Sequence, residues 1–174
     1  MIKTEHKLST KKIKELESLF ANDFSSSVFP LLAEHYYNID DYSRAKKVCE
    51  IGLSKNKHNV QGMFVLAKIF NKLNELYKSE RLIKKTLTAD PVNLNSLLIL
   101  FEVQQKLNRS NDTIAKTISS ILKISPKNIF AKNWMDQNIA KKSNNTKTNK
   151  TKEALQKKQS KPVTSIDRSI KIGS

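Results

Sequence analysis

The strongest constraint in this sequence is an internal repeat with a step of 34 residues. Large apolar residues recur at two places and a short polar residue at a third: Phe29, Met63 and Leu97; Leu32, Leu66 and Leu100; Asp40, Asn74 and Asn108. The step from Pro91 to Pro126 is 35, so the third unit carries one extra residue in or near its second helix. A period of this length predicts a stack of similar units, each burying its apolar face against its neighbours.

Each unit has the pattern of two helices joined by a short corner. Leu66, Phe70 and Leu73 follow helical spacing in the second unit. Small residues that let two helices approach closely recur in both helices: Ala33, Ala45, Gly52, Ala67 and Ser79. The repeated Asp or Asn falls between the helices, where a left-handed residue is needed, and these two types tolerate that conformation best after Gly. With only 3 Gly and 4 Pro, the chain lacks both a Gly-rich phosphate loop and the turns of a many-stranded β fold.

The pattern resembles the tetratricopeptide repeat (TPR). The residues that carry the resemblance are Phe29, Leu32, Ala33, Tyr36, Ala45, Cys49, Gly52 and Leu53 in the first unit, and Met63, Leu66, Ala67, Phe70, Ser79, Ile83, Thr86, Leu87 and Pro91 in the second. Lys57 stands where the first unit should close with Pro, and the third unit has Phe101 for a small residue and Gln104 for an aromatic one. The overall pattern is most similar to small bacterial repeat proteins. The resemblance implies an all-α fold: a right-handed α-solenoid of about three hairpins between two capping helices.

The expected organisation has three parts. Residues 1–10 form a flexible N-terminus, and residues 11–140 form the repeat domain, with units at about 26–59, 60–93 and 94–128. A first capping helix covers about 11–21 with Thr10 as its N-cap, and a closing helix covers 129–140 with Trp134 as its anchor. Residues 141–174 hold 10 of the 32 Lys and Arg but 2 of the 16 acids, and this composition predicts a disordered basic tail.

Catalysis is not expected. Of the three His residues, His35 lies on a repeat helix and is expected to be packed or half-exposed. Cys49, the one cysteine, stands on an apolar face and is expected to fill the core, and one cysteine excludes a multi-Cys zinc site. Asp40 and Asp41 are better explained by capping than by acid–base chemistry. The sequence therefore predicts no catalytic residue, no cofactor and no metal ligand.

Binding is the expected function. The resemblance implies that first helices of successive hairpins line a concave groove, at Glu34, Tyr37, Asn38, Phe64, Lys68, Asn71, Lys72, Asn95, Leu98, Glu102 and Lys106. Amides, lysines and apolar side chains together suit an extended peptide or a helix. Some TPR proteins clamp the C-terminal carboxylate of chaperones, but Pro30 and Glu34 replace the cation and amide which that clamp needs. The leading hypothesis is a non-enzymatic adaptor or scaffold for a protein partner.

The net charge of +16 keeps an alternative open, a nucleic-acid-associated protein that uses the tail. Against it, the tail lacks aromatic residues for stacking, and low-GC genomes favour lysine codons in any case. Weak contact of the tail with an anionic surface is a third possibility. The apolar residues between Val163 and Ile172 predict either a frayed end or a short docking motif. Without a signal peptide or an apolar run of membrane-spanning length, a cytoplasmic protein is expected.

Overall fold

The computed structural model of the chain describes residues 9–138 and divides into two compact units, Met1–Lys132 and Asn133–Ser174. The tail at 141–174, with its Val163–Ile172 motif, lies outside the described residues, as does most of the N-terminal segment at 1–10. The domain boundaries proposed from the sequence stay predictions.

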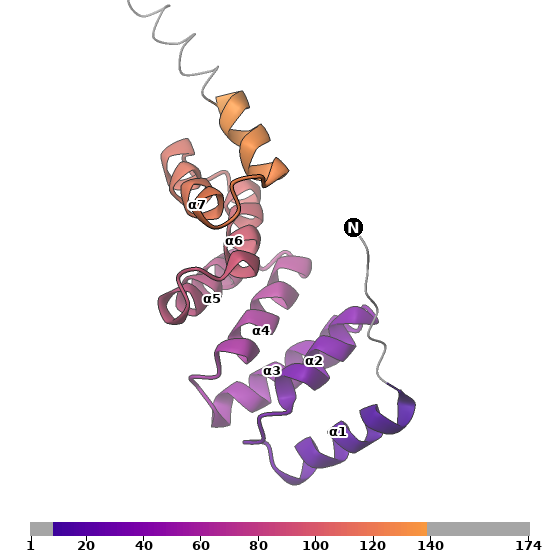
Figure 1. The fold of residues 1–174 in the computed structure, drawn as a ribbon. Coiled ribbons are helices and arrows are strands. Elements are labelled where there is room, and N and C mark those ends of the chain that lie inside the picture. The colour runs from indigo at the N-terminus through magenta and orange to yellow at the C-terminus, as the bar shows by residue number, and fades with distance from the viewer. Residues whose placement is uncertain (1–8, 139–174) are drawn as a thin grey trace, which may run out of the picture. The chain divides into compact units, whose positions relative to one another are not determined.

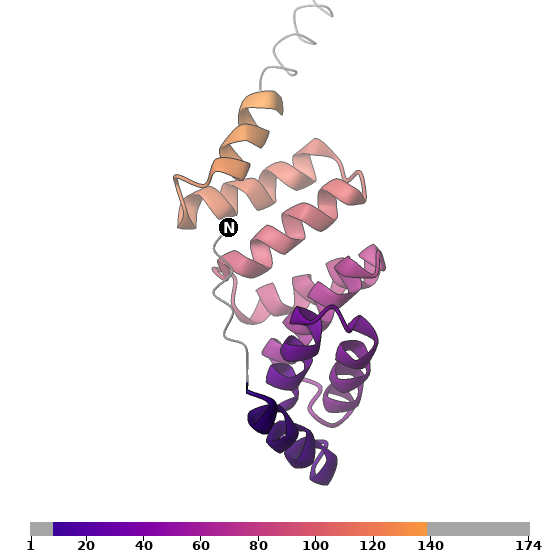
Figure 2. The same ribbon diagram turned by 90° about the vertical axis from the view of Figure 1, so that its right-hand side faces the viewer.

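Every regular element among the described residues is a helix (Figure 1). The labelled helices are α1 (Thr10–Asn22), α2 (Phe29–Asn38), α3 (Tyr42–Lys55), α4 (Val60–Lys72), α5 (Leu76–Ala89), α6 (Leu94–Lys106) and α7 (Asn111–Ile124). Residues 129–138 are also helical, so the predicted closing helix begins at 129. The all-α solenoid of three hairpins predicted from the sequence is confirmed: α2 pairs with α3, α4 with α5 and α6 with α7. Figure 2 shows these hairpins following one another in chain order.

The corner between the two helices of each hairpin has one geometry in all three units. Asp40, Asn74 and Asn108 have φ of 60°, 59° and 50°, which confirms the left-handed conformation predicted there. The following residue donates its backbone N–H to a carbonyl five residues earlier, as from Asp41 to Tyr36 at 2.9 Å. This is the Schellman ending of a helix, and it satisfies carbonyls that the helix leaves open.

The starts of α4, α6 and the closing helix are each capped by an asparagine. The Oδ1 atoms of Asn59, Asn93 and Asn128 accept the backbone N–H of Gly62, Ser96 and Ala131, at 2.7, 2.9 and 3.0 Å. These caps follow the repeat, with steps of 34 and 35 residues, and they set the chain direction where each of these helices begins.

The structure decides two local details, the N-cap of α1 and the position of the extra residue in the third unit. The N-cap of α1 is Ser9, whose side chain accepts the N–H of Lys12, so the prediction of Thr10 was wrong by one residue. The extra residue of the third unit lies between the corner and the cap of α7. Asp41 and Glu75 are N-caps directly after their corner residues, whereas Arg109 separates Asn108 from the N-cap Ser110.

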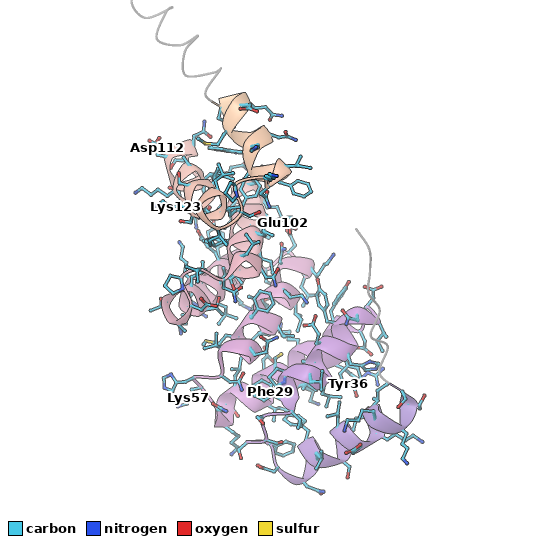
Figure 3. The ribbon with its side chains drawn as sticks, in the orientation of Figure 1. Phe29, Tyr36, Lys57, Glu102, Asp112 and Lys123 are labelled. Carbon is cyan, nitrogen blue, oxygen red and sulfur yellow. The ribbon has the colours of Figure 1, made fainter. Side chains whose placement is uncertain are left out.

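The core is built on close helix contacts. The small side chains predicted to allow these contacts are fully buried, and the Oγ of Ser79 donates to the carbonyl of Ala67 at 2.8 Å, from α5 to α4. Phe29, labelled in Figure 3, is fully buried in α2. Its ring lies against Gly52 of α3 and Gly62 of α4, where a Cβ atom would come within 2.3–2.5 Å of ring carbons. Glycine is therefore required at both positions for packing.

Ion pairs join successive units at one repeated position. Lys46 of α3 lies 2.8 Å from Glu75 at the next corner, and Glu80 of α5 lies 2.6 Å from Arg109 at the corner after that. Glu80 follows Lys46 by 34 residues and Arg109 follows Glu75 by 34, so the same contact is made twice with exchanged charges. If the first unit stacked directly on the third, Lys46 would meet Arg109. The exchange therefore disfavours wrong stacking order by like-charge repulsion.

The first helices lie on the inner side of the stack. α2 contacts α4 and α4 contacts α6, whereas no contact joins α3, α5 and α7 to one another within the described residues. Figure 1 shows α5 and α7 on the left of α4 and α6. In Figure 3, Glu102 of α6 lies on the opposite side from Asp112 and Lys123 of α7. Each hairpin thus presents one face through its first helix and another through its second.

Candidate binding surface

The surface formed by α2, α4 and α6, here called the first-helix surface, carries the residues predicted to line a groove. At its centre Lys68 of α4 donates to the carboxylate of Glu34 of α2. The same ammonium lies 4.3 Å from the ring centroid of Tyr37 and 5.8 Å from that of Phe64. Because a cation over a ring face is attracted by the ring electrons, Lys68 holds two aromatic side chains and one carboxylate together.

A second group joins α4 to α6. The Nζ of Lys106 donates to Oδ1 of Asn71 at 2.9 Å and lies 2.8 Å from Oε1 of Glu102. Burial raises the pKa of Glu102, but hydrogen bonds from Lys106 and Asn71, together with the charge of Lys72, outweigh burial and hold that pKa below its ordinary value. The carboxylate is therefore ionised and already paired at neutral pH.

Tyr37 connects the two groups. Burial raises the pKa of its phenol to about 12, with further contributions from Tyr42 and from the carboxylates of Glu34 and Glu102. The charge of a carboxylate from each group therefore acts on the same phenol. Eight of the eleven residues predicted from the sequence therefore belong to one connected cluster: Glu34, Tyr37, Phe64, Lys68, Asn71, Lys72, Glu102 and Lys106.

The other three predicted residues lie outside that cluster. Asn38 and Asn95 are exposed, and Leu98 is half-buried. Pro30, which was expected at a groove position, is buried in the first turn of α2, so it does not line the surface. The role of all eleven residues in binding stays a prediction.

One neighbour of this surface was missed at the level of the sequence. Tyr42 begins α3, and its ring centroid lies 5.5 Å from that of Tyr37. Its hydroxyl donates to Oδ1 of Asp40 at 2.5 Å, which keeps the ring at the edge of the surface. No repeated pattern marks Tyr42, because the following units have Leu76 and Asn111 at the start of their second helices.

The titratable side chains expected to be inert are placed as predicted. Cys49 is fully buried, and burial raises the pKa of its thiol to about 12, so it is a protonated core side chain at neutral pH. His35 is half-buried beside Tyr36. Among residues 9–138, no three His, Cys, Asp or Glu side chains gather as metal ligands would. None of the helices in that range is long and apolar enough to cross a membrane.

This chain has little sequence similarity to known proteins but a fold similar to several solved structures. No family model matches the chain. The "Uncharacterized protein ycf37" of Pyropia yezoensis is 32% identical over 113 residues, which cover 65% of this chain and 57% of that protein. The chain therefore spans little more than half the length of this relative.

Solved structures are similar at low identity. MamA superposes with a TM-score of 0.68 at 15% identity, over 84% of this chain and 86% of MamA. The TPR domain of Arabidopsis OM64 has a TM-score of 0.58 at 19% identity, over 65% of this chain and 93% of that domain. This chain has the TPR fold. The first TPR of Spaghetti (RPAP3), solved with an HSP90 peptide bound, superposes on this chain with a TM-score of 0.54 at 13% identity, over 75% of this chain and 94% of that one. At these identities the TPR structures establish the architecture of the three hairpins.

Proposed function

We propose that this chain is a non-enzymatic adaptor that holds a protein partner, as an extended peptide or a helix, on its first-helix surface. The observation that carries the proposal is the connected cluster from three successive first helices. A cluster in which Lys68 and Lys106 are held by neighbouring side chains is preorganised, so binding costs little side-chain entropy. The RPAP3 TPR structure, which holds a peptide, supports the same use of the fold.

The chemistry of the cluster narrows the kind of segment that fits. Glu34 and Glu102 largely neutralise the two central lysines, so a strongly acidic peptide gains little there. Asn38 and Asn95 offer exposed amides that can donate and accept, while Phe64 and Leu98 offer apolar contact. A segment with mixed apolar and polar side chains meets these groups better than a charged one.

Site-specific photo-cross-linking in cells tests the proposal. A photoreactive amino acid is placed at Asn38 or at Asn95, which are exposed and lie at separate units of the surface. We expect both positions to capture the same protein, and Phe64→Ala together with Leu98→Ala to abolish that capture. Lys68 is left intact, because its replacement would strand the carboxylate of Glu34.

The matched control places the same photoreactive residue at Lys55 or Lys123, which are exposed on second helices. These positions should not capture that protein. Circular dichroism must show that the Phe64→Ala, Leu98→Ala variant keeps its helix content. Capture that persists in the folded double variant, or that occurs equally at the control positions, would contradict binding on the first-helix surface.

The alternative role in nucleic-acid contact rests on residues 141–174, outside the described range, and stays a prediction. The same holds for contact between that tail and an anionic surface. Cytoplasmic location is likewise a proposal.

A further inference from the structure

The positive charge of the described hairpins is concentrated on their second helices. α3, α5 and α7 carry ten Lys and Arg and three Asp and Glu, whereas α2, α4 and α6 carry three and two. The proposed peptide surface is therefore nearly neutral, and the opposite face of the stack is strongly basic. Such a face attracts anionic partners over distances of about a Debye length.

Within that face the cations follow the repeat. Lys47, Arg81 and Lys116 stand at equivalent positions of α3, α5 and α7, at steps of 34 and 35 residues, and all three are exposed. Lys47 and Arg81 have no ion-pair partner in the part of the chain that the structure describes, and the same is true of Lys85, one turn beyond Arg81. One exposed cation per hairpin thus runs along the stack at an equivalent position of each second helix.

An exposed aromatic ring stands beside this row. Tyr77 of α5 is 70% exposed and lies one turn before Arg81 on the same helix face. The guanidinium of Arg109 lies 5.4 Å from the ring centroid, and Arg109 is itself held by Glu80 at 2.6 Å. The ring is thus supported by one anchored cation and flanked by others, which leaves it available for stacking.

The chemistry of this surface favours one kind of polyanion. An anionic membrane would be met by apolar side chains that insert between lipids, but Tyr77 and Ile124 are the only large apolar side chains exposed on α3, α5 and α7. A duplex is stiff and hides its bases, so the ring of Tyr77 would have no partner. A single strand offers phosphates for the cations and unpaired bases for the ring.

We propose that the surface formed by Lys47, Tyr77, Arg81, Lys85, Arg109 and Lys116, here called the second-helix surface, binds single-stranded nucleic acid. The phosphates contact the row of cations and a base stacks on Tyr77. The site is separate from the first-helix surface and from the tail. A peptide and a single strand could therefore be held at the same time on opposite faces.

Fluorescence anisotropy with the full chain and a labelled 15-nucleotide poly-U strand tests this, at 50 and 200 mM salt. Lys47→Ala, Arg81→Ala and Lys85→Ala together should lower the slope of log affinity against log salt by about 2, since each phosphate contact on a single strand contributes about 0.7. Tyr77→Ala should weaken binding about five-fold or more at either salt concentration. A matched control removes three exposed lysines elsewhere, by Lys11→Ala, Lys14→Ala and Lys57→Ala.

The outcomes separate the possible partners and sites. Equal losses in the triple variant and its matched control would show that only net charge or the tail matters, and would overturn the proposal. A duplex of the same length that binds as tightly as the single strand, or a Tyr77→Ala variant with unchanged affinity, would also overturn it. Vesicles containing phosphatidylserine are the third probe: sensitivity of vesicle binding, but not of RNA binding, to the triple variant would assign the surface to lipid instead. Circular dichroism confirms that each variant is folded.

Discussion

The Phe29 ring packs against Gly52 and Gly62, and this slot sets helix propensity against side-chain packing when Gly52 is replaced. Gly52 lies inside α3, where replacing glycine by alanine normally favours the helix by about 1 kcal/mol. In this structure a Cβ at position 52 would lie 2.3 Å from Cγ of Phe29 and 2.5 Å from both Cδ atoms. We therefore expect Gly52→Ala to destabilise the protein, against its helix propensity.

The magnitude follows from the room available to the ring. Carbon atoms in contact prefer about 3.5–4.0 Å, so the ring would have to retreat by more than about 1 Å. Its freedom to shift is limited, because the far end of the ring lies against Gly62, where a Cβ would be 2.4 Å from Cε2. Overpacking of this kind costs about 1–3 kcal/mol, or more where the neighbour cannot move. Because the ring is confined, the upper end of that range applies, and subtracting the gain in propensity of about 1 kcal/mol leaves an expected net loss of about 2 kcal/mol.

Urea unfolding followed by circular dichroism measures the effect. With a urea dependence of about 1–3 kcal/mol per M, the expected loss lowers the midpoint by about 0.7–2 M. Ser43→Ala, at an exposed position of the same helix, is the control for helix propensity alone. In a Phe29→Leu background, which opens the slot, Gly52→Ala should cost less. A Gly52→Ala variant that is more stable than the wild type would refute the packing argument.

Four further outcomes are expected from particular contacts. Reversing one charge of the second pair, by Glu80→Lys or by Arg109→Glu, should lower the urea midpoint. The double variant should recover part of the loss, since the Lys46–Glu75 pair already has that polarity. Equal midpoints in the single and double variants would argue against the exchanged pairs. Burial raises the pKa of Glu80, but hydrogen bonds from Arg109 and Lys84 prevail and hold it below the ordinary value. Its contribution to stability is therefore present above the unfolded pKa and is lost as pH falls through the folded one, so Glu80→Gln should flatten the decline in melting temperature below about pH 4.3. At the left-handed corner, Asn74→Gly should be tolerated, whereas Asn74→Val should lower the free energy of unfolding by about 1–2 kcal/mol and with it the melting temperature. Because the pKa of Cys49 is raised to about 12 in the core, its reaction with a thiol reagent at pH 8 should follow global unfolding, and rapid labelling of the native protein would show a looser core than the structure has.

Much of the fold could be predicted because its determinants lie within one repeat. The left-handed corners are an example: Asp40 and Asn74 fall where a helix must end and reverse, and their side chains suit that conformation. The smaller errors have the same local character. Ser9 and Thr10 are adjacent and both good N-caps, so propensity alone could not choose between them, whereas the geometry of the first turn did.

The candidate site was predicted in its residue types but not in its contacts. Glu34 and Lys68 are 34 residues apart, so they occupy equivalent positions of adjacent units and the period itself brings them together. The effect of the Glu102 carboxylate on the pKa of Tyr37 is different, because it links the first unit to the third. The row of cations on the second helices follows the same period, but its significance depends on exposure and pairing, which the sequence does not contain.

The sequence by itself determined the helices, the corners, the order of the hairpins and the small residues at their close contacts. These follow from hydrogen bonds and side-chain spacing over a few turns of chain, and the repeat shows the corner residues three times and the small residues twice. Only the tertiary structure decided which charges pair between units, that Lys68 is held by two rings and a carboxylate, and that Arg109 supports an exposed Tyr77. The physical reason is that these contacts depend on the angle and separation at which one hairpin stacks on the next. That geometry results from the packing of many buried side chains at once, so no single stretch of sequence specifies it.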